Sequence, residues 1–307
     1  MKKRFISKKS KKSNKKKLLL IILLLIGIII GFKYLNSGHI KLNDKDIAML
    51  LLINSNNKKK EIISSRYIKS ITKKLSDPVN YLQNSYIKKV EVEPVNVEEP
   101  INILLPIVYI YNSHQSEEYQ SSTFAEFSVN PTVMMADYIL EDLFNKEGMS
   151  TIVEERSIKE ILNNNSWNYA SSYRASRILM ENAYNKYPSL KYFIDIHRDS
   201  LTHEKTTIEI NGRNYARTIF LVGLENDNYE DNLAFTEKIN NIMDSKYPNL
   251  SKGIYKKGGE GVNGIYNQDF SSTTILIEIG GFENTTDEVL NTTLAFYDCF
   301  MEVINEE

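Results

Sequence analysis

A histidine and a glutamate that could bind a metal ion come directly after a short apolar segment. Residues 107–111 are β-branched or aromatic, which predicts a buried strand, and the turn residues Asn112 and Ser113 end it. His114 and Glu117 come directly after this turn, three residues apart. An imidazole and a carboxylate at this spacing can converge on one small cation such as Zn²⁺. A surface loop with an incidental histidine is the alternative interpretation.

Two later segments end in side chains of the same kinds. Residues 190–196 predict a second strand, which closes on His197, and residues 274–279 predict a third, which carries Glu278 inside an apolar run. A buried carboxylate is costly unless it is paired, bound to a metal or protonated. Ligands commonly bind beyond the carboxyl ends of strands in α/β sheets, so we expect one site here. Two His and one Glu are a common ligand set for a catalytic Zn²⁺, and a further Glu would act as the general base.

The elements that must position these residues begin after a different kind of segment. Residues 1–17 hold ten Lys or Arg and no acid, and residues 18–35 form an almost unbroken apolar run. This run is close to the roughly 20 residues that a membrane-spanning helix needs. We expect residues 18–35 to be an uncleaved single-pass anchor in the cell membrane, with residues 1–17 in the cytoplasm and the remainder outside. A cleaved signal peptide is the alternative, although residues 36–38 make a poor cleavage site.

The charge balance differs sharply between this N-terminal region and the remainder. Ten of the 38 Lys and Arg residues lie in residues 1–17, which leaves 28 basic against 39 acidic residues, a balance of −11. An acidic exported part argues against a nucleic-acid partner. The single cysteine, Cys299, excludes an intramolecular disulfide, so the exported part must be stabilised by its own core.

The pattern along the remaining chain predicts a stalk followed by one α/β domain. Residues 36–102 contain two short helical patterns and then a valine- and acid-rich stretch typical of an extended linker. In residues 103–307, predicted strands alternate with predicted helices, which indicates a three-layer α/β/α domain with a mostly parallel or mixed central sheet. The helices are expected at about 131–147, 171–187, 232–247 and 289–305, a further strand at 149–153, and a hairpin around Asn211 and Gly212.

Four motifs give the sequence a resemblance to a known family. They are His114-Gln-Ser-Glu117-Glu-Tyr119, Asp195-Ile-His197-Arg198-Asp199, Tyr266-Asn267-Gln268-Asp269 and Glu278-Ile-Gly280. Residues 103–304 resemble the stage II sporulation protein P family, membrane-anchored cell-wall hydrolases of spore-forming bacteria related to zinc-dependent N-acetylmuramoyl-L-alanine amidases. The resemblance implies cleavage of the amide between N-acetylmuramic acid and L-alanine, with cleavage of peptide cross-links as well. It also implies that His114, Glu117 and His197 bind zinc and that Glu278 is the catalytic glutamate.

One departure from the family concerns the residue before the first motif. The family often has a histidine two residues before the first ligand histidine, and this chain has Asn112 there. An asparagine side chain replaces a metal-binding imidazole poorly. Any metal-binding role of that histidine is therefore absent in this chain, or the role was never essential.

The chemistry of amide hydrolysis suggests roles for the remaining motif residues. Glu278 would take a proton from water and pass it to the leaving nitrogen. Asp195 or Asp199 would orient His197, and Arg198 would hold the oxyanion or a substrate carboxylate, unless it forms a plain salt bridge. The remaining motif residues either line the substrate groove or form a turn; they are Asn267, Gln268 and Asp269.

Two other functions stay open at this point. The domain could be an inactive module that binds peptidoglycan, or a zinc carboxypeptidase that acts on stem peptides and needs an arginine for the substrate carboxylate. The resemblance implies action on peptidoglycan at the mother-cell membrane of the sporulation septum during engulfment. It also implies stage II sporulation proteins D and M as partners. His203 lies in a polar stretch that predicts an exposed loop, so we do not expect it to bind the metal.

Overall fold

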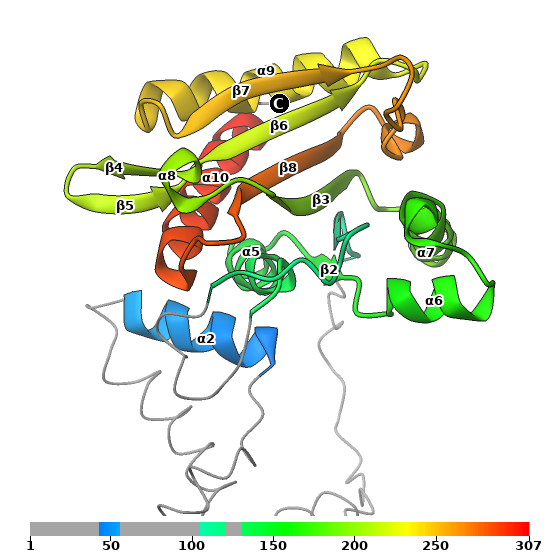
Figure 1. Ribbon diagram of the computed structural model, residues 1–307, viewed down its shortest axis with the longest axis horizontal. Coiled ribbons are helices and arrows are strands. Elements are labelled where there is room, and N and C mark those ends of the chain that lie inside the picture. Colours follow the sequence, from blue (N-terminus) through cyan, green and yellow to red (C-terminus); the bar gives the residue numbers. More distant parts are fainter. Residues whose placement is uncertain (1–42, 56–104, 121–130, 307) are drawn as a thin grey trace, which may run out of the picture.

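The computed structural model describes residues 43–55, 105–120 and 131–306, which form a mixed α/β fold around a six-stranded sheet (Figure 1). The order of strands across this sheet is β2-β1-β3-β8-β6-β7. Strands β2, β1, β3 and β8 are parallel, β6 runs antiparallel to β8, and β7 is parallel to β6. The prediction of a mostly parallel or mixed sheet is confirmed. The strands of the sheet are β1 (Val108–Tyr111), β2 (Thr151–Val153), β3 (Tyr192–Asp199), β6 (Thr218–Gly223), β7 (Ser251–Lys257) and β8 (Thr274–Gly281).

Helices cover both faces of the sheet, and the alternation along β1 shows why. Val108 and Ile110 pack into the main core with α5, α9 and α10, whereas Tyr109 and Tyr111 pack with α7 on the opposite face. Each face is apolar and needs its own helical cover, so three layers result. The helices are α2 (Asp44–Ser55), α5 (Met134–Lys146), α6 (Ile158–Asn164), α7 (Ser172–Lys186), α8 (His203–Thr206), α9 (Tyr229–Lys246) and α10 (Thr286–Asn305), with single 3₁₀ turns η2 (Tyr169–Ser171) and η3 (Gln268–Phe270).

The same alternation decides where the chemical residues point. On β3, Ile194 and Ile196 lie in the main core, so Asp195 and His197 lie on the face that α7 partly covers. On the neighbouring strand β8, Glu278 stands beside His197 in the register of the two strands. Because β1, β3 and β8 are parallel, their carboxyl ends meet at one edge of the sheet.

The predicted hairpin is present as a separate two-stranded sheet of β4 (Thr207–Ile210) and β5 (Arg213–Ala216). Its turn residues Asn211 and Gly212 both have positive φ, 53° and 76°, as a two-residue turn of this kind requires. The sequence predicts one strand over residues 215–223 after this turn, and that prediction is wrong. The strand is interrupted at Arg217, whose backbone N–H donates to the carbonyl of Thr206. The strand β6 then begins in the main sheet.

Three of the helices and strands were not predicted, namely the four-residue helix α8, where a loop was expected, the strand β7 and the helix α6. The strand β7 contains three lysines and pairs only with β6 at the edge of the sheet, so its sequence lacks the apolar pattern of a buried strand. The helix α6 has only seven residues, and Ser157 caps it by accepting a hydrogen bond from the backbone N–H of Glu160. None of these elements carries enough apolar residues for its periodicity to stand out.

The helix predicted near residue 44 is present as α2, and it packs against α5 (Figure 1). Its residues Ile47 and Leu51 are buried in the main core, and Asp44 accepts hydrogen bonds from the backbone and hydroxyl of Thr132. The second stalk helix and the anchor at residues 18–35 lie outside the described residues, and the boundary between stalk and domain stays a prediction. Within the described part, none of the helices is both long and apolar enough to cross a membrane.

Candidate metal centre

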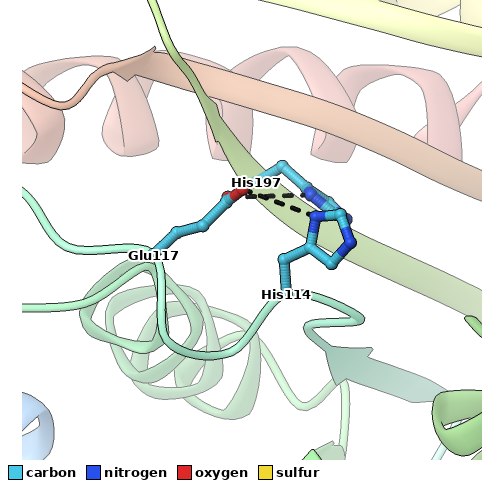
Figure 2. Close-up of side chains that lie close together, drawn as sticks. All are labelled: His114, Glu117 and His197. Atoms are coloured by element: carbon cyan, nitrogen blue, oxygen red, sulfur yellow. Dashed lines mark ion pairs between the residues drawn. The ribbon is translucent and has the colours of Figure 1, made fainter. Parts of the chain in front are cut away.

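Three of the predicted site residues converge at the carboxyl edge of the sheet. His114 and Glu117 lie on the loop after β1, and His197 lies near the end of β3. Figure 2 shows both imidazole rings turned toward the Glu117 carboxylate. The Nδ1 atom of His114 is 3.4 Å from Glu117 Oε1, and the Nδ1 atom of His197 is 3.7 Å from Oε2. One ligand atom of each residue lies within 4.8 Å of those of the other two.

Buried hydrogen bonds fix the orientation of His197. Its Nε2 atom is 3.0 Å from Asp195 Oδ1 and 2.8 Å from the hydroxyl of Ser113, which donates its own proton to Asp195 Oδ2 at 2.8 Å. The backbone N–H of Ser113 donates to the same carboxylate at 2.9 Å. With the Ser113 proton used in this way, Nε2 carries a hydrogen that it donates, and Nδ1 is the atom that faces Glu117. Of the two aspartates expected to orient His197, the structure brings Asp195 into contact with it.

This arrangement fits a zinc ion. Ligand atoms at about 2.1 Å from a tetrahedral ion lie about 3.4 Å apart. His114 is 3.4 Å from one Glu117 oxygen and His197 is 3.7 Å from the other, and one ligand atom of each residue lies within 4.8 Å of the other two. Two imidazoles and one carboxylate are a donor set that Zn²⁺ accepts, and a second imidazole nitrogen held by a carboxylate is the usual support of such a ligand. His114, Glu117 and His197 would hold the ion, and Asp195 would support His197.

The charges in the cluster shift the protonation equilibria of its members. Burial alone would lower the pKa of His197, but the carboxylates of Asp195, Glu117 and Glu278 raise it to about 9. Burial alone would raise the pKa of Glu117. The bond from His114, the charge of His197 and the N–H of Arg198 outweigh this effect and lower it. Without a metal, the cluster is therefore held together by histidine–carboxylate attraction.

Glu278 lies next to this cluster on β8. Burial and the charge of Asp199 raise its pKa to about 7, against the opposing influence of His197 and Lys252. Asp199 forms an ion pair with Lys252 at 3.6 Å and does not contact His197 in any bond that the structure shows. Lys252 was not predicted, because it comes from the unpredicted strand β7. A carboxyl group with a pKa near neutrality can exchange protons at physiological pH.

Arg198 supports Glu117 through its backbone, since its N–H donates to Glu117 Oε2 at 2.9 Å. Its guanidinium donates to the carbonyls of Glu118 and Asp199, at 3.2 and 3.3 Å. The side chain also borders a cavity of about 640 Å³ that is lined by Glu118, Tyr119, Gln120, His203, Phe282 and Glu283. The structure thus places Arg198 beside the cluster, and its expected role toward an oxyanion or a carboxylate stays a prediction.

The three residues Asn267, Gln268 and Asp269 of the third motif all bond to other parts of the chain. Asn267, with a φ of 57°, donates to the carbonyl of Tyr173 and the hydroxyl of Ser176 on α7. Gln268 accepts from the N–H of Gly223 and donates to the carbonyl of Leu221, both on β6. Asp269 forms an ion pair with Arg177. These contacts agree with the turn interpretation, and the alternative role of the three residues in binding substrate stays a prediction.

Aromatic rings that the sequence did not single out surround the histidines. The ring of Tyr169 stacks on His114 with centroids 4.7 Å apart, and the ring of Tyr173 lies parallel to His197 at 6.2 Å. Tyr169 lies in η2 and Tyr173 in the first turn of α7, four residues apart, a spacing that places them on one face of the helical segment. That signal is too common to have identified them. His203 lies outside the cluster, with its Nε2 atom 2.8 Å from Glu288.

Comparison with known proteins gives the same family as the motifs. A family model described as Stage II sporulation protein P (SpoIIP) matches residues 29–301. Stage II sporulation protein P of Bacillus subtilis (strain 168) is 35% identical over 204 residues, which are 64% of this chain and 51% of that protein. The chain thus spans about half the length of this curated relative.

A solved structure of the CwlD amidase from Clostridioides difficile in complex with the GerS lipoprotein also matches. Its TM-score is 0.43 and its sequence identity 12%, over 66% of this chain and all of the matched chain. The family assignment itself rests on the sequence comparisons, because the family model covers most of the chain. They confirm the resemblance that the four motifs predicted, and the chain belongs to the stage II sporulation protein P family.

Proposed function

We propose that this chain is a zinc-dependent peptidoglycan hydrolase that cleaves the amide between N-acetylmuramic acid and L-alanine, and peptide cross-links as well. The observation that supports this most directly is the cluster of His114, Glu117 and His197, whose ligand atoms lie within 4.8 Å of one another. Glu278 stands beside His197 on the adjacent strand. Membership in the stage II sporulation protein P family supports a cell-wall substrate.

The residues divide the work of amide hydrolysis between them. A bound Zn²⁺ would lower the pKa of a water molecule and stabilise the negative charge that develops on the amide oxygen. Glu117 and the two histidines would hold the ion, and Asp195 would keep His197 in the tautomer that leaves Nδ1 free. Glu278 would accept the proton of the attacking water and deliver it to the leaving nitrogen of L-alanine. A pKa near 7 suits both steps.

The cellular setting is part of the same proposal. Residues 18–35 would anchor the protein in the mother-cell membrane and place the hydrolase domain outside the cytoplasm. At the sporulation septum it would act on peptidoglycan during engulfment, beside stage II sporulation proteins D and M. The acidic balance after residue 17 agrees with a cell-wall substrate and not with a nucleic acid.

The test is product analysis with purified full-length protein and isolated peptidoglycan. We expect free stem peptides that begin with L-alanine, seen by mass spectrometry, to be lost after chelation and restored by added Zn²⁺. The variant Glu278→Gln should retain zinc and lose the products, because the glutamine has the same shape and cannot take a proton.

Other outcomes would select the other functions. Release of terminal amino acids alone would indicate a carboxypeptidase. Binding to peptidoglycan with no new ends, with and without zinc, would refute hydrolysis and indicate an inactive binding module.

A further inference from the structure

A buried polar pair lies directly behind the metal cluster. Asn112, at the end of β1, donates from Nδ2 to Asp137 Oδ1 on α5 at 3.1 Å and to the carbonyl of Ile196 at 2.9 Å. Asn112 is 1% exposed and Asp137 is fully buried. Asn112 comes two residues before His114, and Ile196 comes directly before His197. The pair therefore connects α5 to the ends of both strands that carry the histidines.

The second polar atom of each side chain in this pair has no partner among the described residues. These atoms are Asn112 Oδ1 and Asp137 Oδ2, and both are buried. If Asp137 were ionised, both atoms would be acceptors and could not bond to each other. Leaving two buried acceptors unsatisfied, one of them charged, is costly. A single proton on Asp137 Oδ2 turns this acceptor into a donor. It can then bond to Asn112 Oδ1, and both atoms gain a hydrogen-bond partner.

The charges that face Asp137 also oppose its ionisation. Burial is the largest influence that raises its pKa, and the charges of Asp195 on β3 and Asp44 on α2 act in the same direction. The bond from Asn112 and the charge of His197 act in the opposite direction, and the net result lies well above the usual range. Tyr119, which also faces Asp137, has a raised pKa, so its phenol stays neutral and adds no charge.

We propose that Asp137 is a neutral carboxylic acid whose Oδ2–H donates to Asn112 Oδ1, so that the two side chains form a cyclic pair with two hydrogen bonds. This pair is a positioning device for the loop of His114 and the strand end of His197. Asn112, which stands where the family often has a histidine, thus helps to position this loop through an uncharged contact with α5. The proposed protonation state of Asp137 does not depend on the zinc-hydrolase function. The positioning role of the pair rests on that proposed function.

The decisive variant is Asp137→Asn. The asparagine amide can donate to Asn112 Oδ1 and accept from Nδ2, so it keeps both bonds without needing a proton. A carboxyl whose pKa is raised on folding stabilises the fold fully below its unfolded pKa, near 3.8, and this contribution is lost as the pH rises. The folding equilibrium constant of the variant, divided by that of the wild-type protein, should therefore grow about tenfold per pH unit between about pH 5 and about pH 7.

The matched control is Asp244→Asn. Asp244 also accepts a hydrogen bond from an asparagine amide, Asn240 Nδ2 at 3.0 Å, but it is exposed on α9. Its ratio of folding constants should stay flat over the same pH range. A flat ratio for Asp137→Asn as well would overturn the proposal, since it would mean that Asp137 is ionised in the folded protein.

Infrared spectroscopy of the full-length wild-type protein with isotopically labelled aspartate tests the protonation state directly. This test does not depend on whether a variant folds. A protonated carboxyl has a carbonyl stretch apart from the amide and carboxylate bands. We expect the labelled band to persist above pH 7 in the wild-type protein and to vanish in Asp137→Asn. A wild-type spectrum without a labelled neutral-carboxyl band overturns the proposal, whether or not the protein binds zinc.

Zinc affinity tests the positioning role separately. Asp137→Asn should bind zinc as the wild-type protein does, whereas Asp137→Leu, which leaves Asn112 without its partner, should lose about 10- to 100-fold. Equal losses in both variants would mean that a negative charge supports the metal, and would overturn the neutral pair. If the wild-type protein bound no zinc, the zinc hydrolase would be refuted while the folding and infrared results would still decide the state of Asp137.

Discussion

The sharpest test of the metal centre is the substitution Asp195→Asn. Asp195 is fully buried, its Oδ1 lies 3.0 Å from Nε2 of His197, and it is the leading group that raises the pKa of this histidine to about 9. The substitution removes the charge and keeps the shape of the side chain. Because an opposite charge at this range shifts a pKa by about one to three units, we expect the pKa of His197 to fall by that amount in metal-free protein.

The raised pKa of His197 also stabilises the folded metal-free protein, and this stabilisation depends on pH. Raising the pKa of His197 from 6.5 to about 9 corresponds to about 3 kcal/mol of stabilisation in the metal-free protein. This contribution is fully present below about pH 6.5 and is lost as the pH rises through about 9, because the folded state then loses a proton that it bound more tightly than the unfolded state did. In Asp195→Asn most of this pH dependence should disappear. Zinc affinity should fall about 10- to 100-fold, as is typical when the support of a ligand is removed.

The assay is an NMR titration of the histidine rings in chelator-treated protein. The chain contains four histidines, and the signal that disappears in His197→Gln identifies His197. Asp199→Asn is the matched control, because it removes an equal charge from the same strand but from a residue paired with Lys252. An unchanged pKa of His197 in Asp195→Asn, or an equal fall in Asp199→Asn, would refute the assignment of Asp195 as the orienting residue.

Three further predictions follow from the fold and the site. Glu278→Gln should lower kcat by about 10²- to 10⁴-fold, and the wild-type rate should fall as the pH drops through about 7, where Glu278 gains its proton; a variant with wild-type rates would exclude it as the base. Leu51→Ala in α2 should cost about 2–5 kcal/mol in denaturation experiments, since Leu51 is buried in the core; a cost near zero would show that α2 does not hold the domain. Gly280→Ala should destabilise the protein more than Gly148→Ala does. Both glycines have positive φ, but only an alanine at position 280 would place its Cβ 2.8 Å from the Cβ of Ala216. Equal losses of stability in denaturation experiments would contradict this prediction.

Much of the fold was predictable because its buried elements are strongly patterned. The strands β1, β3 and β8 are rich in apolar residues on both faces, as is typical of strands buried on both sides. The helices α7, α9 and α10 were predicted within a few residues of their ends, since their apolar residues recur at helical spacing. The elements that escaped prediction, α6, α8 and β7, are short or lie at an edge, where burial places few demands on the sequence.

Local sequence also determined the composition of the candidate site. A histidine or glutamate at or just beyond the end of each of three apolar runs identified His114, Glu117, His197 and Glu278, because polar groups there need a functional or structural reason. The tertiary structure decided what the sequence left open. It placed Asp195 against His197 and Asp199 against Lys252, and it used Asn267 and Gln268 within the fold.

These decisions depended on contacts between residues far apart in the chain. Alternation along β3 places Asp195 and Asp199 on the same face as His197, so it does not choose between them. The choice follows from the register shift between His197 and Asp199 and from Lys252 on an edge strand two positions away from β8. The pairing of Asn112 with Asp137 requires that α5 cross behind the ends of β1 and β3. Sequence spacing sets which residues share a strand face or a helix face, whereas only packing of one element on another determines which charges meet in the interior.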